Sequence, residues 1–294
     1  MYVWSVSELD KKIRYKDRFR LKVQLLWAFI TNCYIIGFIQ GKIYQGKIKN
    51  VCVPGLNCYS CPGAIGSCPI GSLQAVMGSY EFKFSFYVAG FLIFIGALMG
   101  RFACGWLCPF GLLQELLYKI PFFRKIRTFR GDRALRYLKY VILVVFVILM
   151  PLFIVDIIGQ GAPYFCKLIC PAGTLEGGIP LVLMNKSLQE TVGWLYAWKN
   201  FLLILTIIAC LAIYRPFCKY ICPLGAIYSL FNPISIFGYQ INEEKCTNCN
   251  ACQKVCKMNV DPVKGVRDIE CIRCGKCKNI CPSEALEHKH FKKK

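Results

Sequence analysis

The sequence predicts an all-α membrane domain followed by a small α+β module that is rich in cysteine. Of the 294 residues, 56% are hydrophobic, and the mean hydropathy of +0.44 lies above that of ordinary soluble domains. Four long apolar runs are separated by polar segments. Twenty cysteines are present, a number that indicates either a disulfide scaffold or metal sites.

The N-terminus favours metal sites over a disulfide scaffold. A disulfide-rich secreted protein is normally small and begins with a cleavable signal peptide. Here the first residues are polar and basic, with no apolar stretch before Val23. The only histidines are His288 and His290, both close to the C-terminus. We therefore expect no haem held by histidine within the membrane and no histidine-based catalysis.

Four apolar runs predict four transmembrane helices. A bilayer core of ~30 Å requires about 20 helical residues. Two of the runs meet this length and two are short, so core helices of a soluble protein are the alternative. Aromatic and basic residues flank the runs, as they do in membrane proteins. The expected spans are residues 23–40, 84–100, 138–158 and 194–214.

The basic residues predict the orientation of these spans. Thirty of the 37 Lys and Arg residues lie in 1–22, in 101–139 or after 214, and seven lie in 41–83 and 159–199. The positive-inside rule therefore places both termini in the cytoplasm of a prokaryotic cell, with the chain in its cytoplasmic membrane. The net charge of +21 is then a consequence of membrane topology, and we expect no nucleic-acid partner. The expected domains are a basic tail at 1–22, the membrane domain at 23–238 and the module at 239–294.

The C-terminal module contains two runs with the spacing C-x-x-C-x-x-C-x-x-x-C, which read CTNCNACQKVC and CIRCGKCKNIC. Three cysteines of such a run wrap one [4Fe-4S] cluster, and the fourth reaches the other cluster. Zinc, the alternative, prefers paired C-x-x-C knuckles. A proline follows the fourth cysteine of the second run, but Lys257 stands at the same position in the first run. We therefore expect a local backbone difference there. The spacing predicts a bacterial-type 2[4Fe-4S] ferredoxin domain with the ligand sets Cys246, Cys249, Cys252, Cys281 and Cys271, Cys274, Cys277, Cys256.

A Cys-Pro-x-Gly step recurs after each predicted span and indicates two tandem repeats of two spans. The four steps read CPIGSLQ, CPFGLLQ, CPAGTLE and CPLGAIY, and they begin at Cys68, Cys108, Cys170 and Cys222. Three steps have a second cysteine four residues upstream: Cys104, Cys166 and Cys218. The first departs from this pattern, because Ala64 occupies the position and Cys61 lies seven residues upstream.

Because the spans alternate in direction, two steps fall on the cytoplasmic side and two on the opposite side. The inner pair offers Cys104, Cys108, Cys218 and Cys222 for a third [4Fe-4S] cluster, with a structural zinc or packed cysteine pairs as alternatives. The outer pair offers Cys61, Cys68, Cys166 and Cys170 for a fourth cluster, with disulfides or free thiols as alternatives. Cys58 is a second candidate for the place of Cys61, or forms a disulfide with Cys52. Cys33 and Cys210 are expected to be packing residues.

The runs RFACGWLCPFGLLQ and RPFCKYICPLGAIY, followed by the double-cluster module, resemble the NapH/NosR-type membrane polyferredoxins. The resemblance extends from Arg101 to the C-terminus and implies cytoplasmic clusters and electron exchange with quinol or a flavoprotein. The outer segment CYSCPGAIGSCPIGSLQ departs from NapH and looks more like uncharacterised members of this group from anaerobes.

Three functions are compatible with these patterns. In the first, electrons from a cytoplasmic ferredoxin, flavodoxin or flavoprotein enter the module, whose basic face comprises Lys254, Lys257, Lys276 and Lys278, and cross to an extracytoplasmic redox or flavin-binding partner. This requires clusters recessed into the bilayer. In the second, a cytoplasmic quinone-linked or metal- or cofactor-maturation reductase uses the outer cysteines as disulfides. In the third, the chain is a redox-sensing scaffold. The sequence contains no nucleotide-binding fingerprint, so we expect an electron-transfer subunit and not a complete enzyme.

Overall fold

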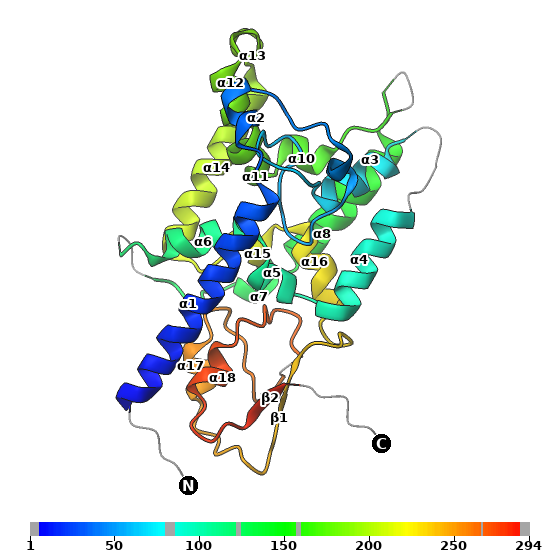
Figure 1. Cartoon of the computed structure of the whole chain (residues 1–294). Coiled ribbons are helices and arrows are strands. Elements are labelled where there is room, and N and C mark those ends of the chain that lie inside the picture. Colours follow the sequence, from blue (N-terminus) through cyan, green and yellow to red (C-terminus); the bar gives the residue numbers. More distant parts are fainter. Residues whose placement is uncertain (1–5, 80–85, 122–124, 157–159, 266, 289–294) are drawn as a thin grey trace.

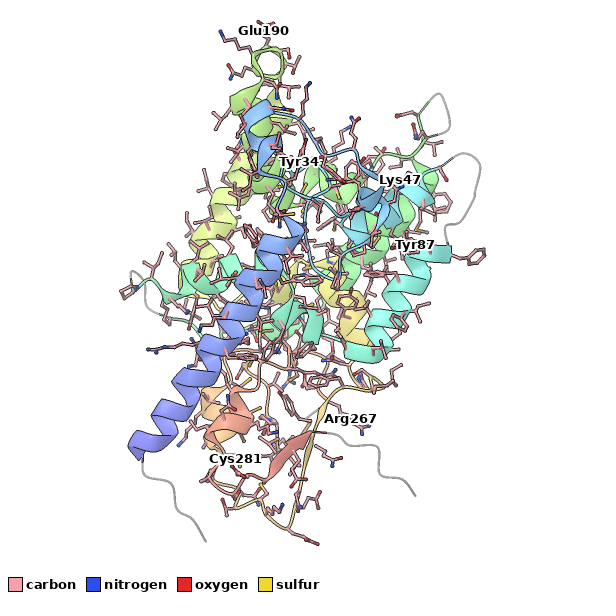
Figure 2. All side chains as sticks on the ribbon, in the orientation of Figure 1. Tyr34, Lys47, Tyr87, Glu190, Arg267 and Cys281 are labelled. Atoms are coloured by element: carbon pink, nitrogen blue, oxygen red, sulfur yellow. The ribbon has the colours of Figure 1, made fainter. Side chains whose placement is uncertain are left out.

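The computed structural model describes residues 6–79, 86–121, 125–156, 160–265 and 267–288. The structure is mostly helical, with a cysteine-rich C-terminal module below a helical domain (Figure 1). The ends of the predicted tail and of the predicted module, 1–5 and 289–294, lie outside the described residues. Figure 2 places Glu190, from the predicted outer segment, and Cys281, from the module, at opposite ends of the molecule.

The helical domain begins with one long helix and a short one, α1 and α2. Three later pairs of helices, α5 and α6, α10 and α11, and α15 and α16, flank Cys-Pro turns. Its helices are α1 (Val6–Thr31), α2 (Ile35–Gln40), α3 (Pro69–Met77), α4 (Phe86–Met99), α5 (Phe102–Trp106), α6 (Pro109–Lys119), α7 (Asp132–Leu135), α8 (Leu138–Ile142), α9 (Met150–Phe153), α10 (Tyr164–Leu168), α11 (Pro171–Gly173), α12 (Ile179–Met184), α13 (Lys186–Glu190), α14 (Trp194–Ala212), α15 (Pro216–Tyr220) and α16 (Pro223–Phe231). A 3₁₀ turn covers Lys47–Asn50, and π-helical turns cover Leu143–Leu149 and Thr174–Gly178.

Two helices in the described part of the chain are long and apolar enough to cross a membrane. They are Asp132–Phe153, which combines α7, α8, a π-helical stretch and α9, and Trp194–Ala212, which is α14. Phe86–Met99 is apolar but shorter. Large apolar side chains such as Ile93 and Phe201 point outward, each with 56% of its surface exposed. Two apolar helices with such outward faces indicate a membrane protein, and the four-span arrangement stays a prediction.

The first predicted span, 23–40, is not one continuous helix. It breaks after Thr31, because the neighbouring backbone groups bond to a loop that follows in the chain. The N–H of Ile65 donates to the carbonyl of Thr31 at 3.1 Å, and the N–H of Tyr34 donates to the carbonyl of Gly63 at 3.1 Å. The loop that carries the first Cys-Pro step is thereby fastened to the top of α1.

The Cys-Pro-x-Gly steps build four similar turns. In each one the cysteine is the N-cap and the proline is the first residue of the following helix, at the start of α3, α6, α11 and α16. Proline suits this position because its missing N–H would have no helical partner there. Three turns follow a short helix, α5, α10 or α15, which carries the upstream cysteine. The turn at Cys68 follows a loop.

The C-terminal module has little regular structure of its own. Strands β1 (Tyr239–Ile241) and β2 (Leu286–His288) form an antiparallel pair in which Tyr239 faces His288. Two short helices, α17 (Ala251–Val255) and α18 (Lys276–Ile280), lie within the two cysteine runs. Helix α1 passes beside α18, where Lys276 on α18 pairs with Asp17 on α1 at 2.9 Å. With so few regular elements, packing around the cysteines must supply much of the order of this module.

Candidate iron–sulfur centres

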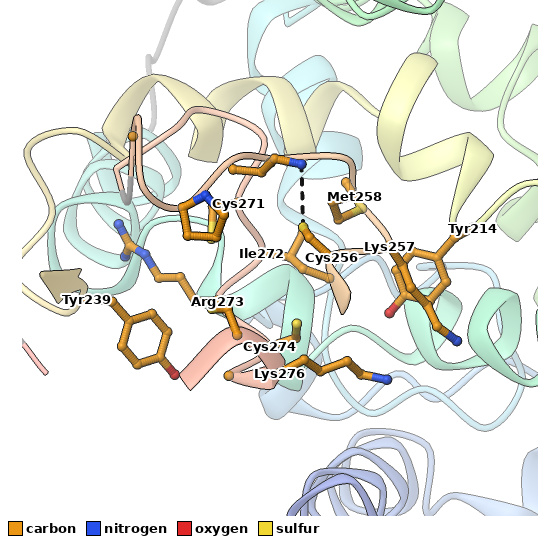
Figure 3. A pocket seen from close by; sticks show the side chains of 15 residues that line it. Tyr214, Tyr239, Cys256, Lys257, Met258, Cys271, Ile272, Arg273, Cys274 and Lys276 are labelled. Carbon is orange, nitrogen blue, oxygen red and sulfur yellow. Dashed lines mark hydrogen bonds between the residues drawn. The ribbon is translucent and has the colours of Figure 1, made fainter. Parts of the chain in front are cut away.

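Each expected ligand set of the module lines its own cavity. One cavity is bordered by Cys246, Cys249, Cys252 and Cys281. The other is bordered by Cys256, Cys271, Cys274 and Cys277 (Figure 3). The structure thus brings together three cysteines from one run and the fourth from the other run in both cases. This is the grouping that the spacing of the runs predicts.

The thiols of the second set act on one another electrostatically. Burial raises the pKa of the Cys277 thiol, and the proximity of Cys274, Cys271 and Cys256 raises it further. Thiols that crowd in a buried space are costly to ionise alone, but a cationic iron core reverses this cost, because thiolates are its ligands. The donor set, four cysteines and nothing else, fits an iron–sulfur cluster.

Lys257, which stands in place of the expected proline, does not change the backbone at the preceding cysteine. Cys256 has φ −72° and ψ 108°, and Cys281, which precedes Pro282, has φ −70° and ψ 114°. The expected backbone difference is therefore absent at this position. The ammonium of Lys257 instead lies over the rings of Tyr118 and Tyr214, 4.9 and 5.5 Å from their centroids, and this cation–π contact fastens the module to the helical domain.

The inner set converges from two Cys-Pro turns. Cys104 on α5 and Cys108 before α6 come from one turn, and Cys218 on α15 and Cys222 before α16 come from the other. All four residues are buried, with at most 6% of the surface of each one exposed. Burial raises the pKa of the Cys222 thiol, as does the proximity of the other three thiols. The four thiols therefore lie near one another in the buried interior.

Two buried arginines connect the two inner turns reciprocally. Arg101 Nη2 donates to the carbonyl of Cys218 at 3.1 Å, and Arg215 Nη1 donates to the carbonyl of Cys104 at 2.5 Å. Each arginine precedes the first cysteine of its own turn by three residues. A Cβ on Gly111 would lie 3.0 Å from Arg215 Nη1, so the glycine of the Cys-Pro-x-Gly step makes room for the arginine of the other repeat.

These arginines are themselves paired with buried carboxylates. Arg101 lies 2.6 Å from Glu270, and Arg215 lies 2.8 Å from Glu115. Both guanidinium groups are fully buried. The positive charges and N–H dipoles of the arginines would stabilise the negative charge of four thiolates and a cluster in this site.

The outer cavity has a volume of about 400 Å³ and is lined by Cys58, Cys68, Cys166 and Cys170. Burial raises the pKa of the Cys170 thiol, and the proximity of Cys166, Cys58 and Cys68 raises it further. The structure therefore brings three of the four predicted outer residues together and adds Cys58, which the sequence offered as the alternative.

Cys61 lies outside this cavity. Its Sγ is 3.7 Å from Oδ1 of Asn32 at the top of α1. The sequence analysis placed Cys61 in the outer set and offered Cys58 as the alternative. The structure places Cys58 in the cavity because the loop before Cys68 is fastened to α1 through Gly63 and Ile65. All twenty cysteines belong to the described residues, and none forms a disulfide in the structure.

Further residues of these sites stand six positions after the cysteine of each Cys-Pro step, and the sequence analysis missed them. Gln74 Nε2 donates to Cys166 Sγ at 3.3 Å, and Gln114 Nε2 donates to Cys218 Sγ at 3.1 Å. Glu176 accepts a bond of 2.7 Å from the N–H of Cys58, and burial raises the pKa of its carboxyl to about 7. The signal was present as the seventh letter of the repeats, which reads Q, Q, E and Y.

The module is docked directly on the inner set. A Cβ on Gly105, which follows Cys104, would lie only 2.2 Å from the carbonyl oxygen of Ile272, which follows Cys271. Trp106 Nε1 donates to the carbonyl of Arg273 at 3.1 Å. The main chain of the second module set therefore touches the main chain of the inner set, with no side chain between them.

The loop around Gly55 lies close to both the inner and the outer set. A Cβ on Gly55 would lie 2.9 Å from the Cα of Cys108, and the backbone of Leu56 and of Asn57 lies near the thiols of Cys108 and Cys68, respectively. The Cα atoms of two consecutive residues lie ~3.8 Å apart. Cys68 and Cys108 also belong to one continuous hydrophobic core. Consecutive residues of one loop thus lie beside the two sets.

Within the described residues, no group of three or more Cys, His, Asp or Glu side chains is close enough to hold a single metal ion. A zinc site requires four ligands within about 2.0–2.3 Å of one ion. The thiolates of a cubane cluster are farther apart, because four irons and four sulfides lie between them. The cysteine sets are compatible with such a cluster.

Comparisons with known proteins agree with this chemistry. Two families of 4Fe-4S binding domains match the chain, one at 84–130 and 194–236 and the other at 239–260. The first match covers both inner turns with the helices that precede them, and the second covers the first cysteine run. No solved structure matches the chain.

The chain is also similar to several named proteins. An uncharacterised protein of Methanocaldococcus jannaschii is 31% identical over 69% of this chain and 78% of its own length. YccM of Escherichia coli, named as a candidate electron transport protein, is 30% identical over 65% of this chain and 51% of its own length. The regulatory protein NosR of Stutzerimonas stutzeri is 25% identical over 57% of this chain and 21% of its own length. Together with the cluster-binding domains and the paired Cys-Pro turns, these relatives show that the chain belongs to the NapH/NosR-type family of polyferredoxins and is an iron–sulfur electron-transfer protein.

Proposed function

We propose that this protein relays electrons from a cytoplasmic donor, through four [4Fe-4S] clusters, to an acceptor on the outer side of the membrane. Two clusters belong to the module, one to the inner set and one to the outer set of Cys58, Cys68, Cys166 and Cys170. In this proposal the chain spans the membrane four times as two tandem repeats, with both termini in the cytoplasm. When bound, each cluster accepts and releases one electron, and no covalent bond is made or broken.

The observation that carries the proposal is the loop at Gly55 and Leu56, which contacts Cys108 and lies in one hydrophobic core with both Cys108 and Cys68. Clusters at opposite faces of a bilayer core of ~30 Å would be too far apart for rapid transfer. Two sets that border one loop and share one core lie closer together than this. The contact of Gly105 with Ile272 closes the remaining gap, between the module and the inner set.

Electrons are proposed to enter at the first module set, because Cys249 is its exposed thiol. The basic face expected to bind an acidic donor is partly used within the protein. Lys276 pairs with Asp17, and Lys257 lies over Tyr118 and Tyr214. Donor docking by ferredoxin, flavodoxin or a flavoprotein therefore depends more on the surface around Cys249 than on these two lysines.

Iron analysis and a vesicle assay test the proposal together. Protein purified without oxygen should contain about sixteen iron atoms, four for each of four clusters, and the Cys166→Ser, Cys170→Ser double variant should contain about twelve. In proteoliposomes with ferricyanide enclosed and a reductant outside, the native protein should reduce the enclosed ferricyanide, and the double variant should not. About twelve irons in both proteins, with no reduction across the membrane, would favour the one-sided reductase that uses only the inner sets.

A further inference from the structure

Tyr228 occupies the fourth of the positions that lie six residues after a Cys-Pro cysteine. The other three residues at this position, Gln74, Gln114 and Glu176, bond to a cysteine of the partner repeat. Gln74 and Glu176 do so at the outer set and Gln114 does so at the inner set. Tyr228 follows Cys222, so the same geometry directs its side chain toward the inner set.

The hydroxyl of Tyr228 is buried and has no partner among the described residues. The residue is 0% exposed, and its oxygen makes no hydrogen bond in the structure. Buried hydroxyls are nearly always bonded. The next residue in the chain follows that rule, because the hydroxyl of Ser229 bonds to the hydroxyl of Tyr140 at 2.6 Å. An unbonded hydroxyl therefore marks the place of a group that only the loaded protein contains.

The surroundings of the ring identify that group. Tyr228 belongs to the same hydrophobic core as Cys104 and Cys108 of the inner set and Cys68 of the outer set. Burial raises the pKa of the phenol, and the proximity of Cys104, Cys68 and Cys108 raises it further. The ring thus lies close to thiols of both sets.

We propose that the Tyr228 hydroxyl donates its hydrogen to a sulfur of the inner cluster, on the side that faces the outer set. This inference deepens the proposed function and rests on the inner cluster of that proposal. Tyr228 is then a positioning residue that sets the reduction potential of the inner cluster. Hydrogen bonds to cluster sulfurs stabilise the more negative, reduced state and raise the potential.

The proposal predicts that Tyr228→Phe lowers the midpoint potential of the inner cluster. The expected loss is about tenfold in the equilibrium constant for its reduction, which corresponds to ~59 mV for a one-electron couple. The measurement is an EPR-monitored redox titration of the signal that disappears in Cys222→Ser. The signals of the two module clusters should keep their potentials.

Two further variants make the test specific. Tyr140→Phe removes a neighbouring hydroxyl that bonds to Ser229 and should leave the midpoint unchanged. Tyr228→Gln restores a donor of the kind found at Gln74 and Gln114 and should keep the midpoint near the native value. An unchanged midpoint in Tyr228→Phe, or an equal fall in Tyr140→Phe, would overturn the proposal.

The remaining outcomes also decide between the alternatives. Tyr228→Phe could fail to retain the inner cluster. In that case, a Tyr228→Gln protein that keeps the cluster and the native midpoint supports the hydrogen bond. Loss of the cluster from Tyr228→Gln as well would overturn the proposal and show that the tyrosine acts through packing. If the outer set proves to hold no cluster, the transmembrane relay fails, but the inner signal can still be titrated. The two proposals can therefore fail separately.

Discussion

The inner and outer cysteine sets are built from the same turn, but their surroundings differ in charge and in space. The inner set is crossed by the buried Arg101 and Arg215, each bonded to a cysteine carbonyl of the other turn. In the outer set the corresponding cation is the half-buried Lys199, which donates to the carbonyl of Cys166 at 3.1 Å, and the buried acid Glu176 lies beside Cys58. The outer cavity is also wide, at about 400 Å³. The inner site therefore has two buried cations beside it, whereas the outer site has one partly exposed cation, a carboxyl group and a wide cavity.

The largest expected effect distinguishes Cys58 from Cys61 as the fourth outer residue. Cys58 lines the outer cavity, and the Cys61 thiol lies against Asn32. We expect Cys58→Ser to lose one cluster, about a quarter of the iron, because a hydroxyl is a poor ligand for iron–sulfur clusters. Cys61→Ser should retain all of it. Iron and sulfide assays check this, and the opposite result would show that the loop before Cys68 folds differently around the cluster.

The next effect tests the difference in charge. Arg215→Ala removes a fully buried cation that pairs with Glu115 and bonds to Cys104. Breaking a buried ion pair costs about 3–5 kcal/mol, so the unfolding temperature should fall sharply, and the potential of the inner cluster should fall because a positive charge is lost. The matched outer variant, Lys199→Met, should cost about 1 kcal/mol, since a partly exposed cation is screened by solvent. Equal losses in thermal unfolding would show that the two sites depend on charge to the same extent.

A smaller effect tests how the sites are spaced. Gly105→Ala forces a Cβ to within 2.2 Å of the Ile272 carbonyl, whereas at Gly173 in the outer turn the nearest atom to a Cβ is Cys58 Sγ at 3.7 Å. Overpacking of the first kind costs about 1–3 kcal/mol and should move the module away from the inner set. We expect slower reduction of the inner cluster by the module in stopped-flow EPR or optical measurements. Gly173→Ala should leave that rate unchanged, and a normal rate in Gly105→Ala would mean that electrons leave the module elsewhere.

The sequence predicts much of this arrangement, because cluster ligands follow strict local spacing. The two module sets were predictable from the runs at Cys246 and Cys271, and the inner set from the two complete Cys-x-x-x-Cys-Pro turns. The choice of Cys58 was not predictable, because it depends on where a loop is fastened to α1, and spacing alone does not encode such a contact. The break after Thr31 was missed for the same reason. The expected span continues past Thr31, but the carbonyl of Thr31 and the N–H of Tyr34 bond to the loop at 63–65.

The residue at the seventh position of the repeats allows the inner and outer sets to be compared bond by bond. Gln114 donates to Cys218 in the inner set, and Gln74 donates to Cys166 in the outer set, with nearly equal lengths of 3.1 and 3.3 Å. Removing one such bond is worth about 1 kcal/mol, and so we expect Gln114→Leu and Gln74→Leu each to lower the potential of one cluster only. The amide oxygen of Gln74 also accepts from the N–H of Phe165 at 2.9 Å, whereas that of Gln114 has no partner among the described residues. Gln74→Leu should therefore loosen α10 as well and lower the unfolding temperature, and Gln114→Leu should change the potential with little loss of stability. Redox titration and thermal unfolding of the two variants separate these effects, and a loss of stability confined to Gln114→Leu would reverse the assignment of the two amides.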